Sequence, residues 1–315
     1  MSLPEEFVRI ARHFRPLAGP GALGLVDDAA VFTPPAGRDM VVAADAMVAG
    51  VHFLHDDPPD LVARKLLRTN LSDLAAMGAV PLGYLLTLSV PRETPDAWFA
   101  AFAAGLALDQ AEFGIALLGG DTTSTPGPVC LSLTILGTVQ PGQALRRTGA
   151  GVGDGVWVTG TIGDGALGLL AARGEIDDAF LADRYRLPRP RVALGRVLHG
   201  IASAAMDVSD GLVQDLGHIC RASGVAAAIE ATLVPLSPAA RRMERLALCL
   251  TGGDDYELLL AVPPALDARL KEVASAAGIA VTRIGAFLAG EARVTVLGQN
   301  GAVLPLERGG WSHFG

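Results

Sequence analysis

The chain has 315 residues, of which 50% are hydrophobic and 18% charged, so it can form two folded domains and is not a disordered chain. Its net charge of −8 without a basic run argues against nucleic acid and membranes as partners, and its longest apolar stretch, ending at Asp109, is too short to span a bilayer. The acidic N-terminus lacks a signal-peptide layout, and Cys130, Cys220 and Cys249 form no CxxC pair, which predicts a cytoplasmic protein.

The first part of the chain predicts a mixture of strands and helices. Ser2 and Glu5 form a capping box, which predicts a helix to about His13. Hydrophobic periodicity and β-branched runs give the remaining elements. The expected strands cover 39–45, 82–91, 115–121 and 129–139, and the expected helices cover 61–78 and 95–113. Because no helix-length segment separates the last two strands, we expect an antiparallel or mixed sheet.

A segment rich in glycine, proline and charge, 140–155, is the best candidate linker between two domains. Beyond it strands and helices alternate, which is typical of a layered α/β domain. The expected strands cover 156–160, 204–210, 225–231 and 256–263, the helices cover 164–174, 189–200, 211–223 and 265–278, and a hairpin turns at Asn300-Gly301. The sequence therefore predicts an α/β (α+β) chain with a mixed-sheet domain at 1–145 and a layered α/β domain at 146–315.

Acidic residues recur at strand ends and tight turns, next to glycine, serine or threonine. These residues are Asp27, Asp28, Asp45, Asp121, Asp207, Asp210, Asp254 and Asp255. Asp73 differs, because it lies within a helical pattern on the same face as Leu66. Strand ends build binding sites in open α/β folds. The alternative is structural, since Asp210 could be a helix N-cap and Asp27 or Asp255 a turn residue.

If these carboxylates converge, they need cations. Two carboxylates about 5 Å apart repel each other by roughly 3 kcal/mol at an effective dielectric constant of about 20. Ligands that are all oxygen, without histidine or cysteine nearby, favour Mg²⁺ or Ca²⁺ over zinc. Because Mg²⁺ is commonly held by a few carboxylates together with substrate phosphates, the pattern points to a nucleotide.

The common phosphate-binding and hydrolase motifs are missing from the sequence. Residues 19–24 match GxGxxG formally, but they lead into an extended segment, so we reject them. Neither Lys65 nor Lys271 follows a glycine as in a Walker A motif, which argues against P-loop and protein-kinase folds. No GxSxG or HExxH motif is present. The remaining candidates for phosphate binding are the glycine-rich turns 119–123 and 159–168 and Arg147.

A series of motifs, taken in order, gives the chain a resemblance to thiamine-monophosphate kinases. The motifs are VDDAAVF (26–32), ADAMVAGVHF (44–53), NLSDLAAMGAVP (70–81), LLGGDTT (117–123), the run 145–168, DVSDGL (207–212), GGDDYEL (252–258) and WSHF (311–314). A looser form of the third motif is shared by the superfamily that resembles aminoimidazole ribonucleotide synthetase and selenophosphate synthetase. VAGVHF and GGDDYEL favour the thiamine branch.

The resemblance implies a fold, a reaction and partners. The fold is aminoimidazole ribonucleotide synthetase-like, and the N-terminal domains pair through their sheets in a homodimer. The reaction is transfer of the γ-phosphoryl group of ATP to thiamine monophosphate, giving thiamine diphosphate, with several Mg²⁺ ions. The alternatives are a related ATP-dependent synthetase or ligase and a non-catalytic Mg²⁺- or nucleotide-binding module, and the product formed from thiamine monophosphate and ATP distinguishes them.

The same resemblance implies roles for individual residues. Those expected to hold Mg²⁺ are Asp28, Asp45, Asp73, Asp121, Asp207 and Asp210, with backbone carbonyls at Ala43 and Ala44. Those expected to contact ATP are Gly120, Asp121, Arg147 and Ser209. Those expected to contact thiamine monophosphate are His52, Asp254 and Trp311. Asp73, Asp121 and Asp210 are expected to act in catalysis.

The chain departs from the family pattern at several positions. Val26 stands where the family usually has glycine, so this turn cannot use dihedral angles reserved for glycine. Ala43 and Ala44 replace a usual Ser-Thr pair, which removes hydroxyl ligands but leaves the backbone carbonyls. Asp254 is one methylene shorter than the usual glutamate, which shortens its reach to the substrate.

Overall fold

The computed structural model describes residues 5–312 of the chain. Proximity of Cα atoms divides the protein into two compact units. The N-terminal unit comprises Met1–Leu74 and Val80–Gly142, and the C-terminal unit comprises Ala75–Ala79 and Gln143–Gly315. The chain changes unit after Gly142, inside the predicted linker, and the predicted domain boundary after residue 145 stays a prediction.

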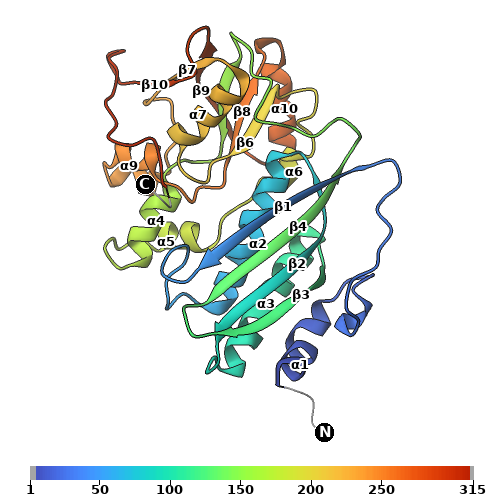
Figure 1. The fold of residues 1–315 in the computed structure, drawn as a ribbon. Helices are drawn as coiled ribbons and strands as arrows, with labels where there is room; N and C mark the ends of the chain where they lie inside the picture. The colour runs from blue at the N-terminus through green and yellow to red at the C-terminus, as the bar shows by residue number, and fades with distance from the viewer. Residues whose placement is uncertain (1–4, 313–315) are drawn as a thin grey trace. The chain divides into compact units, whose positions relative to one another are not determined.

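A mixed sheet forms the centre of the N-terminal unit (Figure 1). Its strands are β1 (Asp39–Val48), β2 (Val80–Pro91), β3 (Leu117–Thr125) and β4 (Cys130–Val139). The order is β1-β4-β2-β3; β2 and β3 are parallel, while β4 is antiparallel to β1 and β2. This arrangement confirms the predicted mixed sheet, with strand ends shifted by a few residues.

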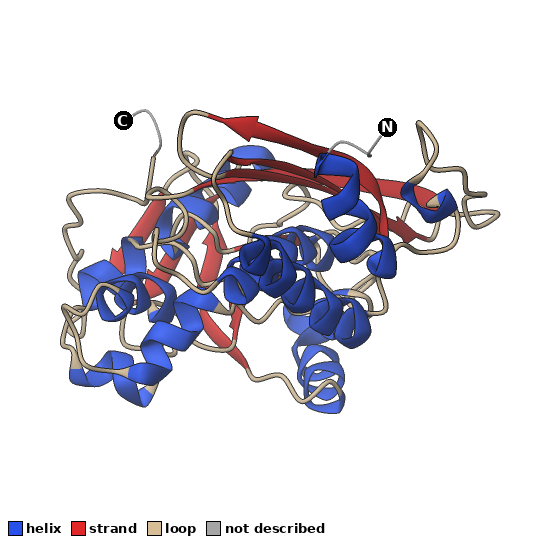
Figure 2. Ribbon diagram, turned by 90° about the horizontal axis from the view of Figure 1, so that it is seen from below, coloured by secondary structure: helices blue, strands red, loops and turns tan. Residues whose placement is uncertain are grey.

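Two long helices, α2 (Pro59–Ala76) and α3 (Asp96–Phe113), lie on one face of this sheet (Figures 1 and 2). Alternation along β2 explains this packing, because Leu86 and Leu88 are buried whereas Thr87 between them is exposed. The face on which Thr87 lies stays partly exposed, and it borders the pocket described below.

The N-terminal segment is helical but changes its helix type along its length. The elements are α1 (Glu5–Arg9), a π-helical turn (Ile10–Phe14) and 3₁₀ turns at Arg15–Leu17 and Leu23–Leu25. Ser2 of the predicted capping box lies outside the described residues. Asp96 at the start of α3 bonds to Arg12 (3.1 Å) and to His13 (2.8 Å), which holds the segment against α3.

A six-stranded sheet runs through the C-terminal unit. Its strands are β5 (Gly155–Thr159), β6 (Ala204–Asp207), β7 (Ala226–Glu230), β8 (Leu258–Val262), β9 (Val281–Leu288) and β10 (Val294–Leu297). The order is β10-β7-β9-β5-β8-β6. β10 and β7 pair in parallel, whereas the other neighbours are antiparallel, so this sheet is mixed as well.

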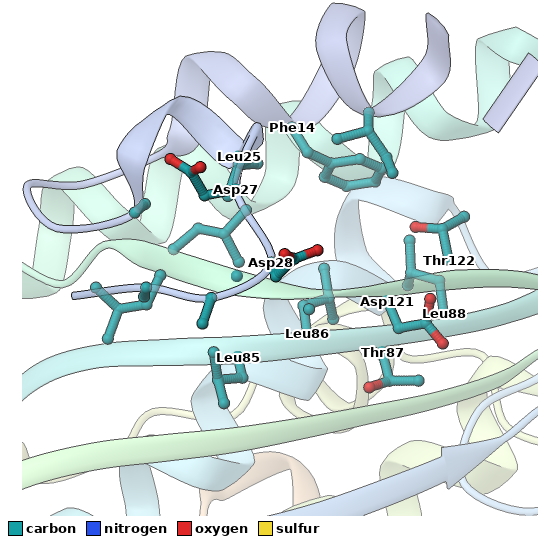
Figure 3. Close-up of a pocket in the computed structure, with 18 of the residues that line it drawn as sticks. Phe14, Leu25, Asp27, Asp28, Leu85, Leu86, Thr87, Leu88, Asp121 and Thr122 are labelled. Atoms are coloured by element: carbon teal, nitrogen blue, oxygen red, sulfur yellow. The ribbon is translucent and has the colours of Figure 1, made fainter. Parts of the chain in front are cut away.

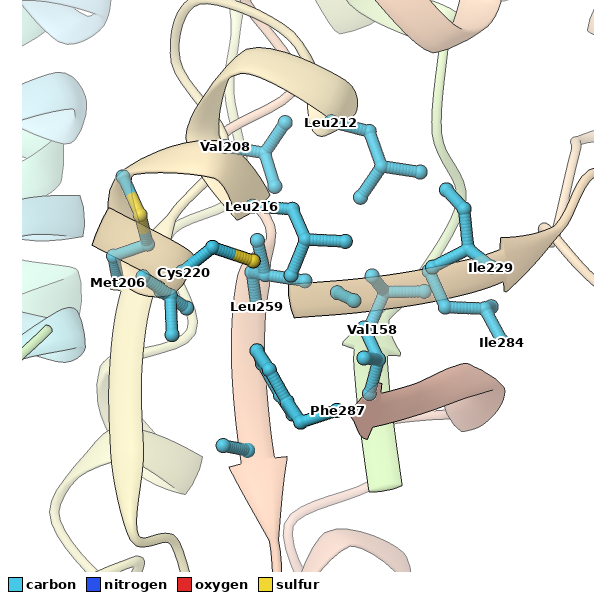
Figure 4. Packing of buried hydrophobic residues seen from close by; sticks show 14 of the residues in the cluster. Val158, Met206, Val208, Leu212, Leu216, Cys220, Ile229, Leu259, Ile284 and Phe287 are labelled. Carbon is cyan, nitrogen blue, oxygen red and sulfur yellow. The ribbon is translucent and has the colours of Figure 1, made fainter. Parts of the chain in front are cut away.

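Helices and the sheet together build the core of the C-terminal unit, which confirms the predicted layered α/β arrangement. The helices are α4 (Asp164–Ala172), α5 (Ala179–Arg186), α6 (Val192–Gly195), α7 (Leu212–Ser223), α8 (Pro238–Arg242), α9 (Leu246–Thr251) and α10 (Asp267–Ala276), with a 3₁₀ turn at Pro264–Leu266. Leu212 and Leu216 of α7 pack with Val158, Leu259 and Phe287 of the strands (Figure 4). Each such burial contributes about 1.5–3 kcal/mol.

Two predicted elements of this unit are wrong in extent. The predicted helix 189–200 shrinks to the single turn of α6, because Pro190 precedes this turn and glycines at 195 and 200 disfavour its extension. The predicted hairpin at Asn300-Gly301 is reduced to β10 and one bridge between Leu297 and Val303. Its return arm contains Pro305, which has no N–H to donate to a ladder.

Several short elements were not predicted. β9 escaped notice because Arg283 and Gly285 interrupt its apolar pattern. A Cβ at Gly285 would collide with the carbonyl oxygen of Ala228, so the glycine allows β9 to approach β7. The short helices α5, α8 and α9 have too few turns to give a clear helical period.

Candidate active site

A pocket of about 640 Å³ opens beside the sheet of the N-terminal unit (Figure 3). Asp27 and Asp28 of the first acidic motif line it together with Gly120 and Asp121 of β3. Apolar side chains such as Phe14 complete its walls. The pocket therefore brings together Asp28, Gly120 and Asp121, all predicted site residues, beside a surface that suits an apolar ring.

The backbone at Gly120 sets the position of Asp121. Gly120 has a φ of +155°, and a Cβ there would collide with the carbonyl oxygen of Leu86 on β2. Glycine alone fits this close approach, and the parallel register then places Asp121 opposite Thr87. Val26, the departure in the first motif, has a φ of −118°, which any residue can adopt.

His52 lies in a tight turn just after β1. The backbone N–H of Val48 donates to its Nδ1 (3.0 Å), and Nζ of Lys65, a buried side chain on α2, donates to its carbonyl oxygen (2.9 Å). Because Nδ1 accepts a hydrogen bond, we assign the neutral tautomer with the proton on Nε2.

Asp45 and Asp73 lie on β1 and α2, and neither is among the residues that line the pocket. Asp45 stands opposite buried Leu133 on β4, and burial raises the pKa of its carboxyl group. Asp73 is half-buried on the predicted helix face, where Leu66 and Asn70 are fully buried. Oδ1 of Asn70 is buried and accepts no hydrogen bond within the described residues. This uncharged oxygen lies one turn before Asp73.

Ala43 and Ala44 lie on β1, which is an edge strand of the sheet. In an antiparallel pair, alternate residues of an edge strand turn their carbonyl groups away from the neighbouring strand. One of these two alanines therefore has a backbone carbonyl that the ladder with β4 does not use. The predicted contact between a metal ion and a backbone carbonyl of Ala43 or Ala44 is therefore geometrically possible.

In the C-terminal unit, the loop after β6 carries Asp207, Ser209 and Asp210. One oxygen of buried Asp215 accepts backbone N–H groups from Ser209 (3.0 Å), Asp210 (3.0 Å) and Gly211 (3.1 Å). Asp210 is not the N-cap of α7, because that position belongs to Gly211. The loop is therefore held from within the helix, and the Asp210 side chain is left for other contacts.

The GGDDYEL segment pairs with the same loop. The N–H of Asp254 donates to Ser209 (2.9 Å) and that of Tyr256 donates to Val208 (2.8 Å). Gly253 has no room for a Cβ, which would collide with the carbonyl oxygen of Ser209. The segment thus places predicted residue Asp254 beside predicted residue Ser209.

Asp254 and Tyr256 both adopt left-handed backbone conformations, with φ of 68° and 52°. Such conformations cost non-glycine residues about 1–3 kcal/mol each and are concentrated at functional sites. Tyr256 donates its hydroxyl to Oδ1 of Asp254 (3.1 Å). This hydrogen bond orients the Asp254 carboxylate.

Two further acids of GGDDYEL, Asp255 and Glu257, hold neighbouring segments in place through hydrogen bonds, and the sequence did not predict these roles. Asp255 accepts the N–H groups of Gly163 (2.7 Å) and Gly165 (2.9 Å), which fixes the glycine-rich turn before α4. Fully buried Glu257 accepts from Arg191 (2.6 Å) and Arg184 (3.2 Å). The signal available in the sequence was that Asp255 and Glu257 alternate at the start of a strand. Their partners, two glycine N–H groups for Asp255 and two arginines for Glu257, lie far away in the sequence.

Arg147 and Trp311 lie at opposite ends of the C-terminal unit's chain, and both lie near α7. The carbonyl oxygen of Arg147 accepts from Ser223 Oγ at the end of α7 (3.1 Å). Burial lowers the pKa of His218 on α7, and the positive charges of Arg221 and Arg147 lower it further. The N–H of Trp311 donates to the carbonyl oxygen of Asp210 (2.9 Å).

The predicted acids supply only oxygen atoms as metal donors, which is the donor chemistry that Mg²⁺ prefers. No group of three or more His, Cys, Asp or Glu in the described part of the chain is close enough to hold an ion. Burial and the nearby charge of Asp207 raise the pKa of Asp215 to about 7, so negative charge is already crowded here. Mg²⁺ needs few carboxylates when phosphates and water complete its shell, and the oxygen-only donors suit it.

Two family models match the chain: "AIR synthase related protein, N-terminal domain" at residues 26–139 and "AIR synthase related protein, C-terminal domain" at residues 151–297. A thiamine-monophosphate kinase of Caulobacter vibrioides is 48% identical over 98% of this chain and 91% of its own length. These matches cover both units, so the similarity is not confined to one motif.

Solved structures agree with this similarity. The crystal structure of a thiamine-monophosphate kinase from Stenotrophomonas maltophilia K279a is 40% identical, with a TM-score of 0.82 over 95% of both chains. AaThiL complexed with AMPPCP and TMP is 28% identical, with a TM-score of 0.76 over 93% of this chain and 97% of that chain. Among the helices that the structure describes, none has the length and apolarity needed to cross a membrane.

Proposed function

This chain belongs to the thiamine-monophosphate kinase family of the AIR synthase related proteins, and we propose which of its residues bind the substrates and perform the reaction. The reaction is the ATP-dependent phosphorylation of thiamine monophosphate to thiamine diphosphate. The observation that carries this conclusion is the 48% identity to a thiamine-monophosphate kinase over 98% of the chain. Its free cysteines are consistent with the predicted cytoplasmic location, which stays a prediction.

The ATP end of the reaction is assigned to the pocket of the N-terminal unit and to two residues of the C-terminal unit. Gly120 and Asp121 line the pocket, where the apolar wall suits the adenine ring. Arg147 and Ser209 are the further ATP contacts, since a guanidinium group and a hydroxyl group both bond well to phosphate oxygens. The AaThiL complex with AMPPCP, an analogue of ATP, supports an ATP site in this fold.

Mg²⁺ is assigned to two sets of oxygen ligands, one in each unit. The set in the N-terminal unit comprises Asp28, Asp45, Asp73, Asp121 and a backbone carbonyl at Ala43 or Ala44. The set in the C-terminal unit comprises Asp207 and Asp210. Bound Mg²⁺ would supply charge neutralisation between two anionic phosphates. The protein's own task is to hold the carboxylates in place, which Asp215 and Gly120 support.

The acceptor in this reaction is itself a phosphate, so its attacking oxygen is already anionic and no strong general base is needed. The residues therefore have to bind and orient rather than remove a proton. His52 would donate its Nε2–H to the thiamine phosphate. The face of the Trp311 ring and the Asp254 carboxylate suit the thiazolium cation.

We also propose a homodimer that pairs through the sheet of the N-terminal unit. Val42 on β1 and Leu85 on β2 are 60% and 40% exposed, and each stands opposite a residue of the central strand β4. Exposed apolar side chains gathered on one sheet face are typical of an interaction surface. Leu85 also lines the pocket, so the proposed ATP site would open onto this interface.

A direct assay tests the proposed function against its alternatives. Purified protein is incubated with thiamine monophosphate, ATP and Mg²⁺, with and without chelator, and thiamine diphosphate and ADP are quantified. We expect equal amounts of both products, and none with chelator. ADP without thiamine diphosphate would favour a related synthetase or ligase, whereas nucleotide binding without any product would favour a binding module.

A further inference from the structure

The chain just before the C-terminus docks against the first turn of α7. The N–H of Trp311 donates to the carbonyl oxygen of Asp210 (2.9 Å). Gly310 lies so close that an added Cβ would stand 2.5 Å from Cβ of Gln214 and 2.6 Å from the carbonyl oxygen of Asp210. Residues 309–312 are therefore packed onto the helix start that follows Asp210.

Gln214 connects residues 309–312, which we call the tail, to the loop that carries Asp210. Its Nε2 donates to the carbonyl oxygen of Trp311 (2.7 Å) and to Oδ2 of Asp210 (3.3 Å). A side-chain amide has two N–H groups, so one nitrogen can serve both acceptors. The shorter bond goes to the tail, which indicates that the tail is the main partner.

The hydrogen bonds to Asp210 and Gln214 explain how the exposed tail is held in one conformation. Trp311 is 54% exposed, so burial of its ring contributes little to its placement. An exposed segment without buried side chains samples many conformations, and ordering it costs about 1–2 kcal/mol per residue. The bond from the Trp311 N–H to Asp210 and the bond from the Gln214 amide to the Trp311 carbonyl oxygen fix the backbone at this position against α7.

We propose that Gln214 is a positioning residue for the substrate: it holds Trp311 beside Asp210 so that the ring can bind the thiamine cation. The proposal rests on the proposed function, because it uses the roles assigned to Trp311 and Asp210. Gln214 touches neither substrate in this assignment and acts through the tail. Its loss weakens thiamine monophosphate binding and leaves ATP binding in place.

Two kinds of variant test the proposal. Gln214→Leu removes both N–H donors at similar size. Gly310→Ala adds the methyl group that the docked tail has no room for, without any change to α7, and the Gly310 backbone is outside the left-handed region. Gly309→Ala is the matched control, because the nearest atoms to its added Cβ are 3.9 and 4.0 Å away.

The first readout is structural and independent of activity. Trypsin cuts after Arg308, directly before the docked residues, and mass spectrometry follows the loss of residues 309–315. We expect cleavage to be about tenfold faster in Gln214→Leu and Gly310→Ala than in wild type and Gly309→Ala, since one hydrogen bond is worth about a factor of ten. Unchanged cleavage in both test variants overturns the proposal.

The second readout separates the two substrates. We expect the KM for thiamine monophosphate to rise about tenfold in Gln214→Leu and Gly310→Ala, with the KM for ATP within about twofold of wild type. Trp311→Ala is measured beside them. If Trp311→Ala raises this KM and the test variants do not, the proposal fails while the role of Trp311 stands. If Trp311→Ala has no effect, the assignment of Trp311 under the proposed function fails, and the positioning role falls with it.

Discussion

The hydrogen bond from the Val48 N–H fixes the tautomer of the neutral His52 ring. The N–H of Val48 donates to Nδ1, so the proton of the neutral ring belongs on Nε2. A glutamine amide nitrogen reaches about as far as Nε2, whereas an asparagine amide nitrogen reaches about as far as Nδ1. We therefore expect His52→Gln to raise the KM for thiamine monophosphate less than about threefold and His52→Asn to raise it about tenfold or more.

The KM for ATP serves as the internal control for the His52 series, and steady-state kinetics with each substrate varied in turn provide both constants. We expect the ATP constant to stay within about twofold in both variants, because the assigned partner of His52 is the thiamine phosphate. Equal losses in His52→Gln and His52→Asn would show that the position of the N–H donor is irrelevant.

Asp73 is the residue on which the charge argument can be tested most simply. Asp73→Asn keeps the shape of the side chain on a helix whose Leu66 and Leu71 are fully buried, so α2 should still fold. Loss of one anionic Mg²⁺ ligand should lower kcat by about 100-fold or more. Circular dichroism checks the fold, and a magnesium titration of kcat should show a raised requirement.

Asp60→Asn is the matched control for Asp73→Asn. Asp60 lies in the first turn of the same helix, where its charge contributes about 0.3–1 kcal/mol to helix stability through the helix dipole. We expect a slightly lower melting temperature and an unchanged kcat. A near-normal kcat in Asp73→Asn would remove this residue from the catalytic set.

At the scale of secondary-structure elements, the N-terminal helical segment is attached to the start of α3 through Asp96. Asp96 at the start of α3 receives both Arg12 and His13, and the guanidinium of Arg9 lies 4.7 Å from the ring centre of Phe99. The hydrogen bond to His13 lowers the pKa of Asp96, and the bond to Arg12 adds to this shift. A lowered pKa in the folded state means that the attachment is complete above the ordinary aspartate pKa and is lost as the pH falls through the lowered value.

The predicted consequence concerns residues 5–17, which carry part of the pocket wall. Asp96→Asn should reduce amide hydrogen-exchange protection in this segment at pH 7, and Glu93→Gln, an exposed neighbour, should not. The difference between wild type and Asp96→Asn should shrink as the pH falls below the ordinary aspartate pKa and through the lowered value, where the wild-type carboxylate also becomes protonated. A difference that persists at low pH would show that the charge of Asp96 is not the attachment.

The elements also show which features of this fold a sequence can predict. α2 was predictable because its apolar residues follow the helical period along its 18 residues. α3 was predictable because Pro95 marks its start and Gly114 marks its end. β9 was not, because Gly285 serves a close approach to β7 that is invisible along the chain. Local periodicity predicts long elements, whereas short ones depend on contacts made only after folding.

The candidate site divides in the same way. Asp28, Gly120 and Asp121 were predictable from motifs, and the structure brings these three into one pocket. Asp215 and Glu257 were not, because their roles arise from partners such as the Ser209 N–H and Arg191, which are brought near by the fold. A positioning role depends on partners that the fold brings near, so even Glu257, which lies within GGDDYEL, does not reveal its partner in the local sequence.

For the whole molecule, the composition and the reaction fit together. The chain has an excess of acids, with a net charge of −8, and it would bind two phosphorylated substrates. Such a protein repels anionic ligands unless cations intervene, so we expect its activity to depend steeply on Mg²⁺. A lysine-based site would not show this dependence to the same degree, and this chain has neither a Walker A lysine nor a cluster of lysines.

The proposed homodimer gives the last prediction, because an exposed sheet face has to be covered by something or carry a cost in solubility. Val42 is 60% exposed on β1, and in a self-complementary interface a charged side chain introduced there is introduced on both copies and loses its hydration when the sheets pair. Val42→Arg should therefore convert a species of twice 32.4 kDa into one of 32.4 kDa in light scattering. Val152→Arg, at an equally exposed valine of the C-terminal unit, should leave the mass unchanged. If wild type itself has the mass of one chain, the sheet face serves another purpose, and the pocket beside it must be complete within a single chain.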